Sequence, residues 1–147
     1  MIYRKFEAKD IDSLCEIEEE CFTMPWHRES FEEMLDNACA LFIVAEDDTN
    51  VVCGYAGVLA VLGEGEICNV AVRSDHRSQG IGEQIVRKLM EIGRSEYGIF
   101  DFTLEVRESN KPARNLYEKL GFAYEGSRPR FYENPTEDAA IYWLRNQ

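Results

Sequence analysis

The sequence has no long hydrophobic run and little of the chemistry on which metal sites depend. No segment approaches the ~18 consecutive apolar residues that a membrane-spanning helix needs, and the opening residues, MIYRKFEAKD, lack the apolar core of a secretory signal. The 2 histidines stand apart, and the 5 cysteines show no CxxC spacing. These absences predict a cytoplasmic protein with no membrane partner and no bound metal, whose cysteines are reduced and serve as small buried hydrophobes.

Basic residues are also scarce. The chain has 16 lysines and arginines against 28 acidic residues, a formal net charge of -12. Such a charge disfavours nucleic acid as a partner, because proteins neutralise its phosphates with Lys and Arg. It favours cationic partners such as amines or basic peptide tails, although an acidic surface also serves solubility alone. The length predicts a single domain over residues 1–147.

Hydrophobic periodicity predicts a mixed α/β domain. Helical spacing marks residues 10–22, 28–35, 80–95 and 111–120, while strand-like runs cover residues 40–46, 51–61, 63–72, 99–106, 122–128 and 138–145. We expect Asp10 to cap the first helix. Short turns join the first three strands, which predicts an antiparallel β-meander. A central βαβ crossover and a C-terminal β-hairpin complete the expected mixed sheet.

Two glycines and several cations gather at the start of a predicted helix, in VAVRSDHRSQGIGEQIVRKLM (residues 70–90). Gly80 and Gly82 let backbone amides approach a ligand, and a helix start adds free N–H groups and partial positive charge. Residues 70–95 carry five basic against three acidic side chains. This combination favours a phosphate or pyrophosphate ligand. A tight strand-to-helix turn without a ligand is the alternative.

The same segment lacks the Gly-Lys-Ser/Thr ending of a P-loop and the GxGxxG pattern of dinucleotide folds. It resembles instead the acetyl-coenzyme A segment of the GNAT acyltransferases, whose Arg/Gln-x-x-Gly-x-Gly/Ala pattern is matched by Arg77, Gly80 and Gly82. LEVRESNKPARNLYEKLGF, CFTMPWHRESF and RPRFYENPTEDAAIYW are similar to segments of the RimI-like protein N-terminal acetyltransferases. The resemblance covers most of the chain and implies a GNAT-like fold that uses acetyl-CoA.

The resemblance also implies where acetyl-CoA binds. The strand backbone would pair with the pantetheine arm, as a strand edge pairs with a peptide, and the glycine loop would wrap the pyrophosphate. The residues assigned in this way are Val70, Ala71, Val72, Arg77, Ser78, Gln79, Gly80, Ile81, Gly82, Glu83 and Asn110. Taken alone, residues 70–72 also fit an ordinary buried strand, and Asn110 fits a helix N-cap.

Two further residues are implied in catalysis. Strand alternation puts Glu105 on the face opposite the apolar set Phe100, Phe102, Leu104 and Val106. Partial burial there would raise its pKa toward that of a useful base, whereas the alternative is a solvated glutamate or one in a salt bridge, with Arg107 as a candidate partner. Tyr117 lies on the apolar face of its helix, where a core role is the default, but its polar tip also suits a site wall. The resemblance implies that Glu105 is the general base and Tyr117 the general acid.

By the same resemblance, the reaction is acetylation of a protein N-terminal α-amine, with the N-terminal alanine of a small-subunit ribosomal protein as the expected acceptor. Tyr132 and the loop over residues 132–137 are expected to line the peptide groove. Two alternatives stay open: acetylation of a small amine, such as a polyamine or an aminoglycoside, and a coenzyme A binding module without catalysis. The presence of both Glu105 and Tyr117 argues against the module.

Overall fold

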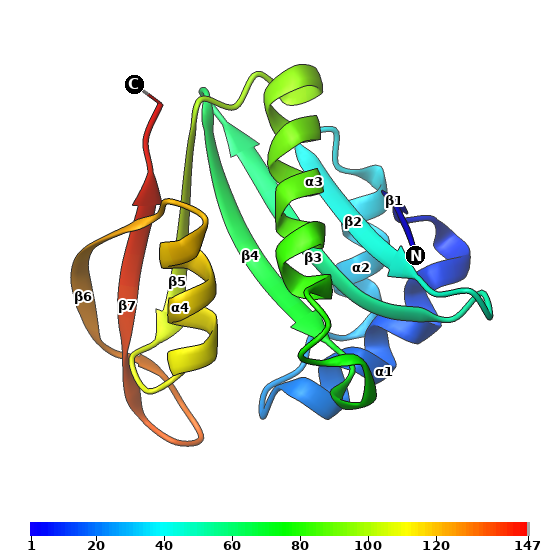
Figure 1. Cartoon of the computed structure of the whole chain (residues 1–147), viewed down its shortest axis with the longest axis horizontal. Coiled ribbons are helices and arrows are strands. Elements are labelled where there is room, and N and C mark those ends of the chain that lie inside the picture. Colours follow the sequence, from blue (N-terminus) through cyan, green and yellow to red (C-terminus); the bar gives the residue numbers. More distant parts are fainter. Residues whose placement is uncertain (147) are drawn as a thin grey trace.

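The computed structural model describes residues 1–146, in which a mixed β-sheet is covered by helices on both faces (Figure 1). The strands are β1 (Ile2–Lys5), β2 (Ala40–Glu46), β3 (Val52–Val61), β4 (Glu64–Val72), β5 (Asp101–Arg107), β6 (Ala123–Tyr132) and β7 (Glu137–Leu144). The α-helices are α1 (Ile11–Cys21), α2 (Arg28–Asp36), α3 (Ile81–Tyr97) and α4 (Lys111–Lys119). Two 3₁₀ turns, Ala8–Asp10 and Ser74–His76, precede α1 and α3.

The seven strands form one sheet in the order β1-β2-β3-β4-β5-β7-β6. Strands β2, β3 and β4 pair in antiparallel fashion, which confirms the predicted meander. The chain then crosses through α3 to β5, which pairs parallel to β4, as the predicted crossover requires. Strands β6 and β7 form the predicted hairpin, and β7 inserts beside β5.

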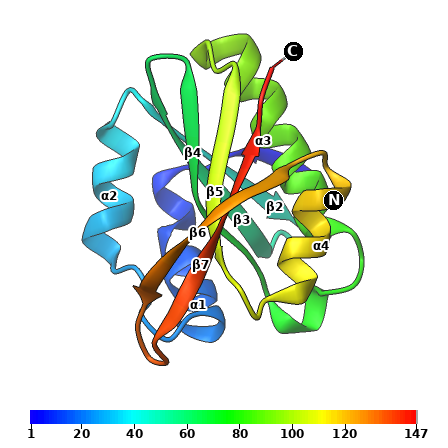
Figure 2. The same ribbon diagram turned by 90° about the vertical axis from the view of Figure 1, so that its left-hand side faces the viewer.

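Two hydrophobic cores lie on the two faces of the sheet. Helices α1 and α2 cover one face, and α3 and α4 cover the other (Figure 2). The larger core packs α3 residues such as Ile85 and Leu89 against strands β2 to β5. The smaller core contains the aromatic side chains of Phe31, Phe42 and Tyr55, stacked between α1, α2 and the sheet. The apolar stripes read from the sequence therefore face these two cores.

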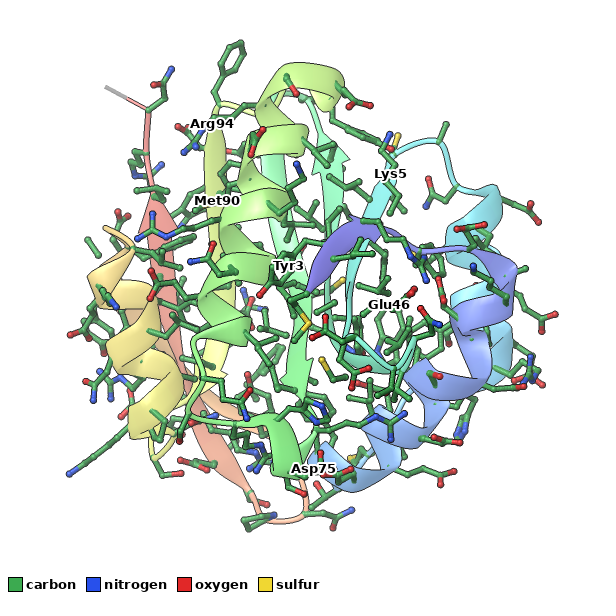
Figure 3. The ribbon with its side chains drawn as sticks, turned by 45° about the vertical axis from the view of Figure 1, so that its right-hand side comes forward. Tyr3, Lys5, Glu46, Asp75, Met90 and Arg94 are labelled. Atoms are coloured by element: carbon green, nitrogen blue, oxygen red, sulfur yellow. The ribbon has the colours of Figure 1, made fainter. Side chains whose placement is uncertain are left out.

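The first strand was not predicted, because four residues with no regular burial pattern give no period-2 signal. β1 lies at the sheet edge against β2, with Lys5 on β1 and Glu46 on β2 (Figure 3). Lys5 donates to Glu96 of α3, and Arg4 donates to Glu46. The predicted N-cap was also wrong. Asp10 has helical backbone angles and does not cap α1. Its carboxylate instead accepts hydrogen bonds from Arg4 and from the Glu7 N–H.

Three other details refine the sequence reading. Gly121 takes a positive φ of 99° just after α4, as expected of a residue that ends a helix. Phe100 was expected on the buried face, but it precedes β5 and is 62% exposed. The five cysteines are free, yet only Cys53 is fully buried and Cys39 is exposed, so the prediction of five buried thiols was wrong. Within residues 1–146, no helix is both long enough and apolar enough to span a bilayer.

Candidate active site

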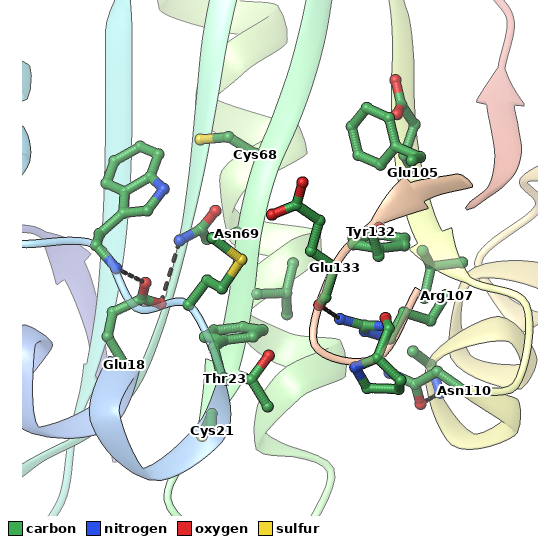
Figure 4. A pocket seen from close by; sticks show the side chains of 18 of the residues that line it. Glu18, Cys21, Thr23, Cys68, Asn69, Glu105, Arg107, Asn110, Tyr132 and Glu133 are labelled. Atoms are coloured by element: carbon green, nitrogen blue, oxygen red, sulfur yellow. Dashed lines mark hydrogen bonds between the residues drawn. The ribbon is translucent and has the colours of Figure 1, made fainter. Parts of the chain in front are cut away.

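A cleft of about 520 Å³ opens where β4 and β5 diverge. The two strands pair from Glu64–Asp101 to Ile67–Leu104, and beyond that point each continues without the other (Figure 1). The α1–α2 segment and the β6–β7 loop flank the gap and supply its outer walls (Figure 4). The divergence leaves backbone groups of β4 unpaired on the side that faces the cleft, which is the geometry needed to bind an extended, amide-bearing ligand.

A bulge in β4 contributes to this divergence. Gly57 pairs with Asn69 whereas Val58 pairs with Ile67, so Cys68 is the extra residue on β4. Such a bulge bends its strand and redirects the side chains that follow. A Cβ at residue 57 would overlap the Phe42 ring, which explains why glycine stands opposite the bulge.

Glu105 lies on β5 in the wall of the cleft (Figure 4). Its Oε2 is buried and has no hydrogen-bond partner within residues 1–146, while Oε1 lies 3.4 Å from Arg128 Nη2. Burial raises the pKa of this carboxyl, Arg128 opposes the rise and Glu66 adds to it. A partly desolvated carboxylate with a free oxygen can accept a proton from a group bound in the cleft.

The alternative salt bridge to Arg107 is not formed. Arg107 instead donates to the carbonyl oxygens of Glu133 and Pro135 and contacts Glu137, which ties the β6–β7 loop to β5. Its guanidinium also lies 4.6 Å from the centre of the Tyr132 ring, and Tyr132 lines the cleft as expected. Burial and the nearby Glu105 raise the pKa of Tyr132 to about 12.

Tyr117 is both a core residue and a residue that lines the cleft. Its ring is buried against Phe122 and Tyr142, as expected for a core tyrosine, and the residue also lines the cleft that contains Glu105. Burial raises the pKa of Tyr117, so its hydroxyl keeps its proton at neutral pH. A protonated hydroxyl in the wall of the cleft can act as a proton donor.

The start of α3 presents free backbone amides. Gly80 adopts a left-handed conformation with φ 76° and begins the helix, and the first helical bond runs from Gln84 N–H to the Gly80 carbonyl. The N–H groups of residues 81–83 therefore precede the hydrogen-bonded ladder. A Cβ at Gly82 would meet Val72 and Leu116 at 3.7 and 3.8 Å, ordinary contacts, so packing does not require glycine there. Without a Cβ, Gly82 would also leave its backbone open to a ligand.

Charge in this region is less available than the sequence indicated. Arg73 pairs with Glu16, and Arg87 pairs with Glu83, which Lys119 also contacts at 2.7 Å. Arg77 turns back to donate to the Val72 carbonyl oxygen and lies 3.3 Å from the Cys21 sulfur. Any anion bound at this helix start would therefore depend mainly on backbone amides and the helix dipole.

The remaining predicted binding residues are distributed as follows. Val70 lines the cleft, Ala71 is buried in the core, and the Val72 carbonyl accepts from Arg77. Ser78 is exposed and takes a positive φ of 64° in the loop before α3. Asn110 lines the cleft and also caps α4 by accepting a hydrogen bond from the Ala113 N–H, so both readings of this residue fit its position.

Sequence reasoning missed a polar network in the opposite wall. Glu18 of α1 is 1% exposed, and its carboxylate accepts hydrogen bonds from the Trp26 N–H, the Tyr55 hydroxyl and the Asn69 side-chain amide. A signal was present, because Leu14, Ile17, Glu18 and Cys21 follow i, i+3, i+4, i+7 spacing, which puts Glu18 on the buried stripe. The acidic run around it conceals that position.

Comparison with known proteins agrees with this architecture. A profile described as the acetyltransferase (GNAT) family matches residues 11–122, most of the chain. The chain belongs to the GNAT acetyltransferase family. A protein of Bacillus subtilis, provisionally named a ribosomal protein bS18-alanine N-acetyltransferase, is 38% identical over 142 residues, covering 96% of this chain and 93% of the relative.

Two further GNAT proteins are similar over nearly their full length. The ribosomal protein bS18-alanine N-acetyltransferase of Haemophilus influenzae is 33% identical, covering 92% of this chain and 90% of the relative. The crystal structure of the ribosomal-protein-S18-alanine N-acetyltransferase of Escherichia coli superposes with a TM-score of 0.86 at 28% identity, covering 98% and 92% of the two chains. The protein is therefore an acetyl-CoA-dependent N-acetyltransferase with the GNAT fold.

Proposed function

We propose that this GNAT enzyme acetylates the α-amine of a protein N-terminus, with the N-terminal alanine of a small-subunit ribosomal protein as its acceptor. The observation that carries the proposal is the cleft between β4 and β5, which contains both Glu105 and Tyr117 in its walls. The names of the relatives supply the acceptor, ribosomal protein bS18. A net charge of -12 favours approach of a basic protein tail. In this proposal, residues 1–147 act as one acetyltransferase domain.

Acetyl-CoA would bind with its pyrophosphate at the start of α3 and its pantetheine arm along the open edge of β4. The free amides of residues 81–83, the left-handed Gly80 and the space beside Gly82 fit a phosphate group. Bound acetyl-CoA supplies an activated acetyl group as a thioester. Replacing Gly82 with Asp would put a carboxylate beside the phosphates. Calorimetry should then show a large loss of acetyl-CoA affinity with an intact fold, whereas Gly82→Ala should lose far less.

Glu105 acts as the base in this mechanism. An N-terminal α-amine has a pKa of about 7.7–8.0, far below the ~10.4 of a lysine side chain. One carboxylate with a modestly raised pKa is therefore sufficient to remove its proton, directly or through a water molecule. The Glu105 Oε2, which is buried without a partner, accepts that proton. The deprotonated amine then has its lone pair free for attack on the thioester carbonyl.

Tyr117 acts as the acid. As the carbon–sulfur bond breaks, the sulfur gains the electron pair and the Tyr117 hydroxyl gives it a proton. The Tyr117 hydroxyl is protonated at neutral pH, so its proton is available as the thiolate forms. A free thiol has a pKa of about 8.5, so the thiolate is a fair leaving group at neutral pH and needs only moderate help.

Mass spectrometry after incubation with acetyl-CoA tests the acceptor. The substrates are an alanine-terminated basic peptide, the same peptide with a blocked N-terminus and an internal lysine, and a polyamine. We expect one acetyl group on the α-amine of the first peptide and little on the other two substrates. Acetylation mainly of the polyamine would replace the proposal with a small-amine acetyltransferase, and no acetylation of any substrate would leave coenzyme A binding alone.

A further inference from the structure

The side chain of Asn69 is held in one orientation at the wall of the cleft opposite Glu105 (Figure 4). Asn69 follows the β4 bulge and lies just beyond the last β4–β5 pair, Ile67–Leu104. Its Nδ2 atom is 3.1 Å from Glu18 Oε2 and 2.9 Å from the Tyr55 hydroxyl oxygen. The amide nitrogen therefore faces two neighbouring acceptors inside the protein.

The chemistry of Glu18 dictates this orientation. An ionised carboxylate only accepts hydrogen bonds, and two other donors already converge on it, the Trp26 N–H at 2.7 Å and the Tyr55 hydroxyl at 2.5 Å. Burial raises the pKa of Glu18, and these hydrogen bonds oppose the rise and favour the ionised form. Asn69 must then turn its NH₂ group toward Glu18, because its carbonyl oxygen would meet a second acceptor.

As a consequence, the Asn69 Oδ1 atom is turned away from the network. Within residues 1–146 it receives no hydrogen bond, although the residue lines the cleft. A buried carboxylate is costly unless its hydrogen bonds are complete. The buried Glu18 carboxylate, whose hydrogen bonds are complete, orients Asn69 so that its Oδ1 atom faces the cleft. The amine that is to be acetylated must lie in that space to reach Glu105.

We propose that the Asn69 Oδ1 atom accepts a hydrogen bond from an N–H group of the peptide acceptor, and that Glu18 is the positioning residue that orients it. This inference rests on the proposed acetylation of a peptide N-terminus and names a residue that binds the acceptor. The N-terminal residue of a peptide would lie between Asn69 on β4 and Glu105 on β5. On one side the Asn69 Oδ1 atom would accept its hydrogen bond, and on the other Glu105 would act as the base.

Replacing Asn69 with Ala removes this oxygen. A neutral hydrogen bond is worth about 0.5–1.5 kcal/mol, so the KM for an alanine-terminated peptide should rise about two- to thirteenfold. The KM for acetyl-CoA and kcat should stay within twofold of wild type. The matched control is Asn50→Gly, which removes an exposed amide from the β2–β3 turn, where a positive φ of 65° suits glycine. An unchanged peptide KM in Asn69→Ala, or an equal rise in both KM values, would overturn the inference.

Exchanging the acid and the amide between positions 18 and 69 tests the role of Glu18. In Glu18→Gln alone, the Asn69 amide can rotate and present its NH₂ group to the cleft, so the peptide KM should rise. In the double variant Glu18→Gln, Asn69→Asp, the glutamine amide introduced on α1 can donate to the new carboxylate on β4, whose second oxygen faces the cleft. The peptide KM should then recover toward wild type. A Glu18→Gln variant that unfolds at lower temperature yet keeps the wild-type peptide KM would reduce Glu18 to a purely structural residue.

Failure of this inference can be told apart from failure of the proposed function. If the wild-type enzyme does not acetylate the peptide α-amine, the proposed function is wrong and the inference falls with it. If the wild type acetylates the peptide and the Asn69 variants match its peptide KM, only the role of Asn69 is wrong.

Discussion

The two walls of the cleft each contain a glutamate, Glu18 fully buried and Glu105 half-buried, and the two carboxylates differ in how their oxygens are hydrogen-bonded. Burial raises the pKa of both Glu18 and Glu105. Glu18 accepts hydrogen bonds from three donors, whereas Glu105 has one oxygen 3.4 Å from Arg128 and another without a partner in the described chain. In the proposed mechanism, burial alone does not make a base, because a carboxylate oxygen must also be free to accept a proton.

The largest expected effect comes from replacing Glu105 with Gln. General bases contribute about 10²–10⁴-fold, so kcat/KM for an alanine-terminated peptide should fall by that factor at pH 7. The folded state should not lose stability. Because the folded-state pKa of Glu105 is raised, ionisation costs stability as pH rises, and Glu105→Gln should unfold at or above the wild-type temperature at pH 7. Calorimetry checks this, and the advantage should disappear below about pH 4, where a free glutamate is protonated.

Replacing Tyr117 with Phe should have a smaller effect, near the low end of the range for acid catalysis, about 10²-fold in kcat. The ring that packs against Phe122 is retained, so the unfolding temperature should change little. Product should be quantified by mass spectrometry, since free thiols of this protein, such as the exposed Cys39, would react with a thiol-sensing dye. A kcat within twofold of wild type would return Tyr117 to a purely structural role.

Replacing Glu18 with Gln should reverse the pattern seen at Glu105. The new NH₂ group would face the donors of Tyr55 and Asn69, and an unsatisfied buried group costs about 1–3 kcal/mol. We expect the free energy of unfolding to fall by about that amount in urea titrations, while kcat falls less than tenfold. If Glu18→Gln abolished turnover without loss of stability, the assignment of Glu18 as a structural carboxylate would be wrong.

Replacing Arg128 with Ala should have the smallest effect. Arg128 lowers the pKa of Glu105, and its side chain is largely exposed, so solvent weakens the interaction. Its removal should raise the pKa of Glu105 and move the acidic limb of the kcat/KM profile to higher pH. Activity should fall below pH 6.5 and stay near wild type at pH 8. A limb that moves to lower pH would show that another group titrates there.

Much of the fold was predictable because the strands and helices carry strong periodic signals. The meander, the crossover and the hairpin follow from periodic apolar residues and from short turns between them. Strand β1 was not predictable, because it is short and partly exposed and is held by pairing with β2 and by Arg4, whose partner Glu46 is distant in sequence. Tertiary contacts of this kind leave no local pattern.

The site was only partly predictable for a similar reason. Alternation along the strand placed Glu105 on the face opposite the apolar residues, and helical spacing placed Tyr117 at the core. Neither pattern could show that β4 and β5 diverge after Ile67 and Leu104, next to the bulge at Cys68, because neither feature leaves a local signal in the sequence. The ion pair from Arg128 was equally hidden, because β7 lies between β5 and β6 in the sheet and Arg128 reaches Glu105 from the far side of it.

The central claim is that Glu105, and no other carboxylate, removes the proton from a peptide α-amine. The most direct test is the ratio of wild-type to Glu105→Gln kcat/KM on an alanine-terminated peptide from pH 6.5 to 9.5. Above its pKa of about 7.7–8.0 the α-amine loses its proton unaided. The ratio should therefore be largest at pH 6.5 and shrink steadily toward pH 9.5. A ratio that stays constant over this range would contradict the assignment of Glu105 as the base.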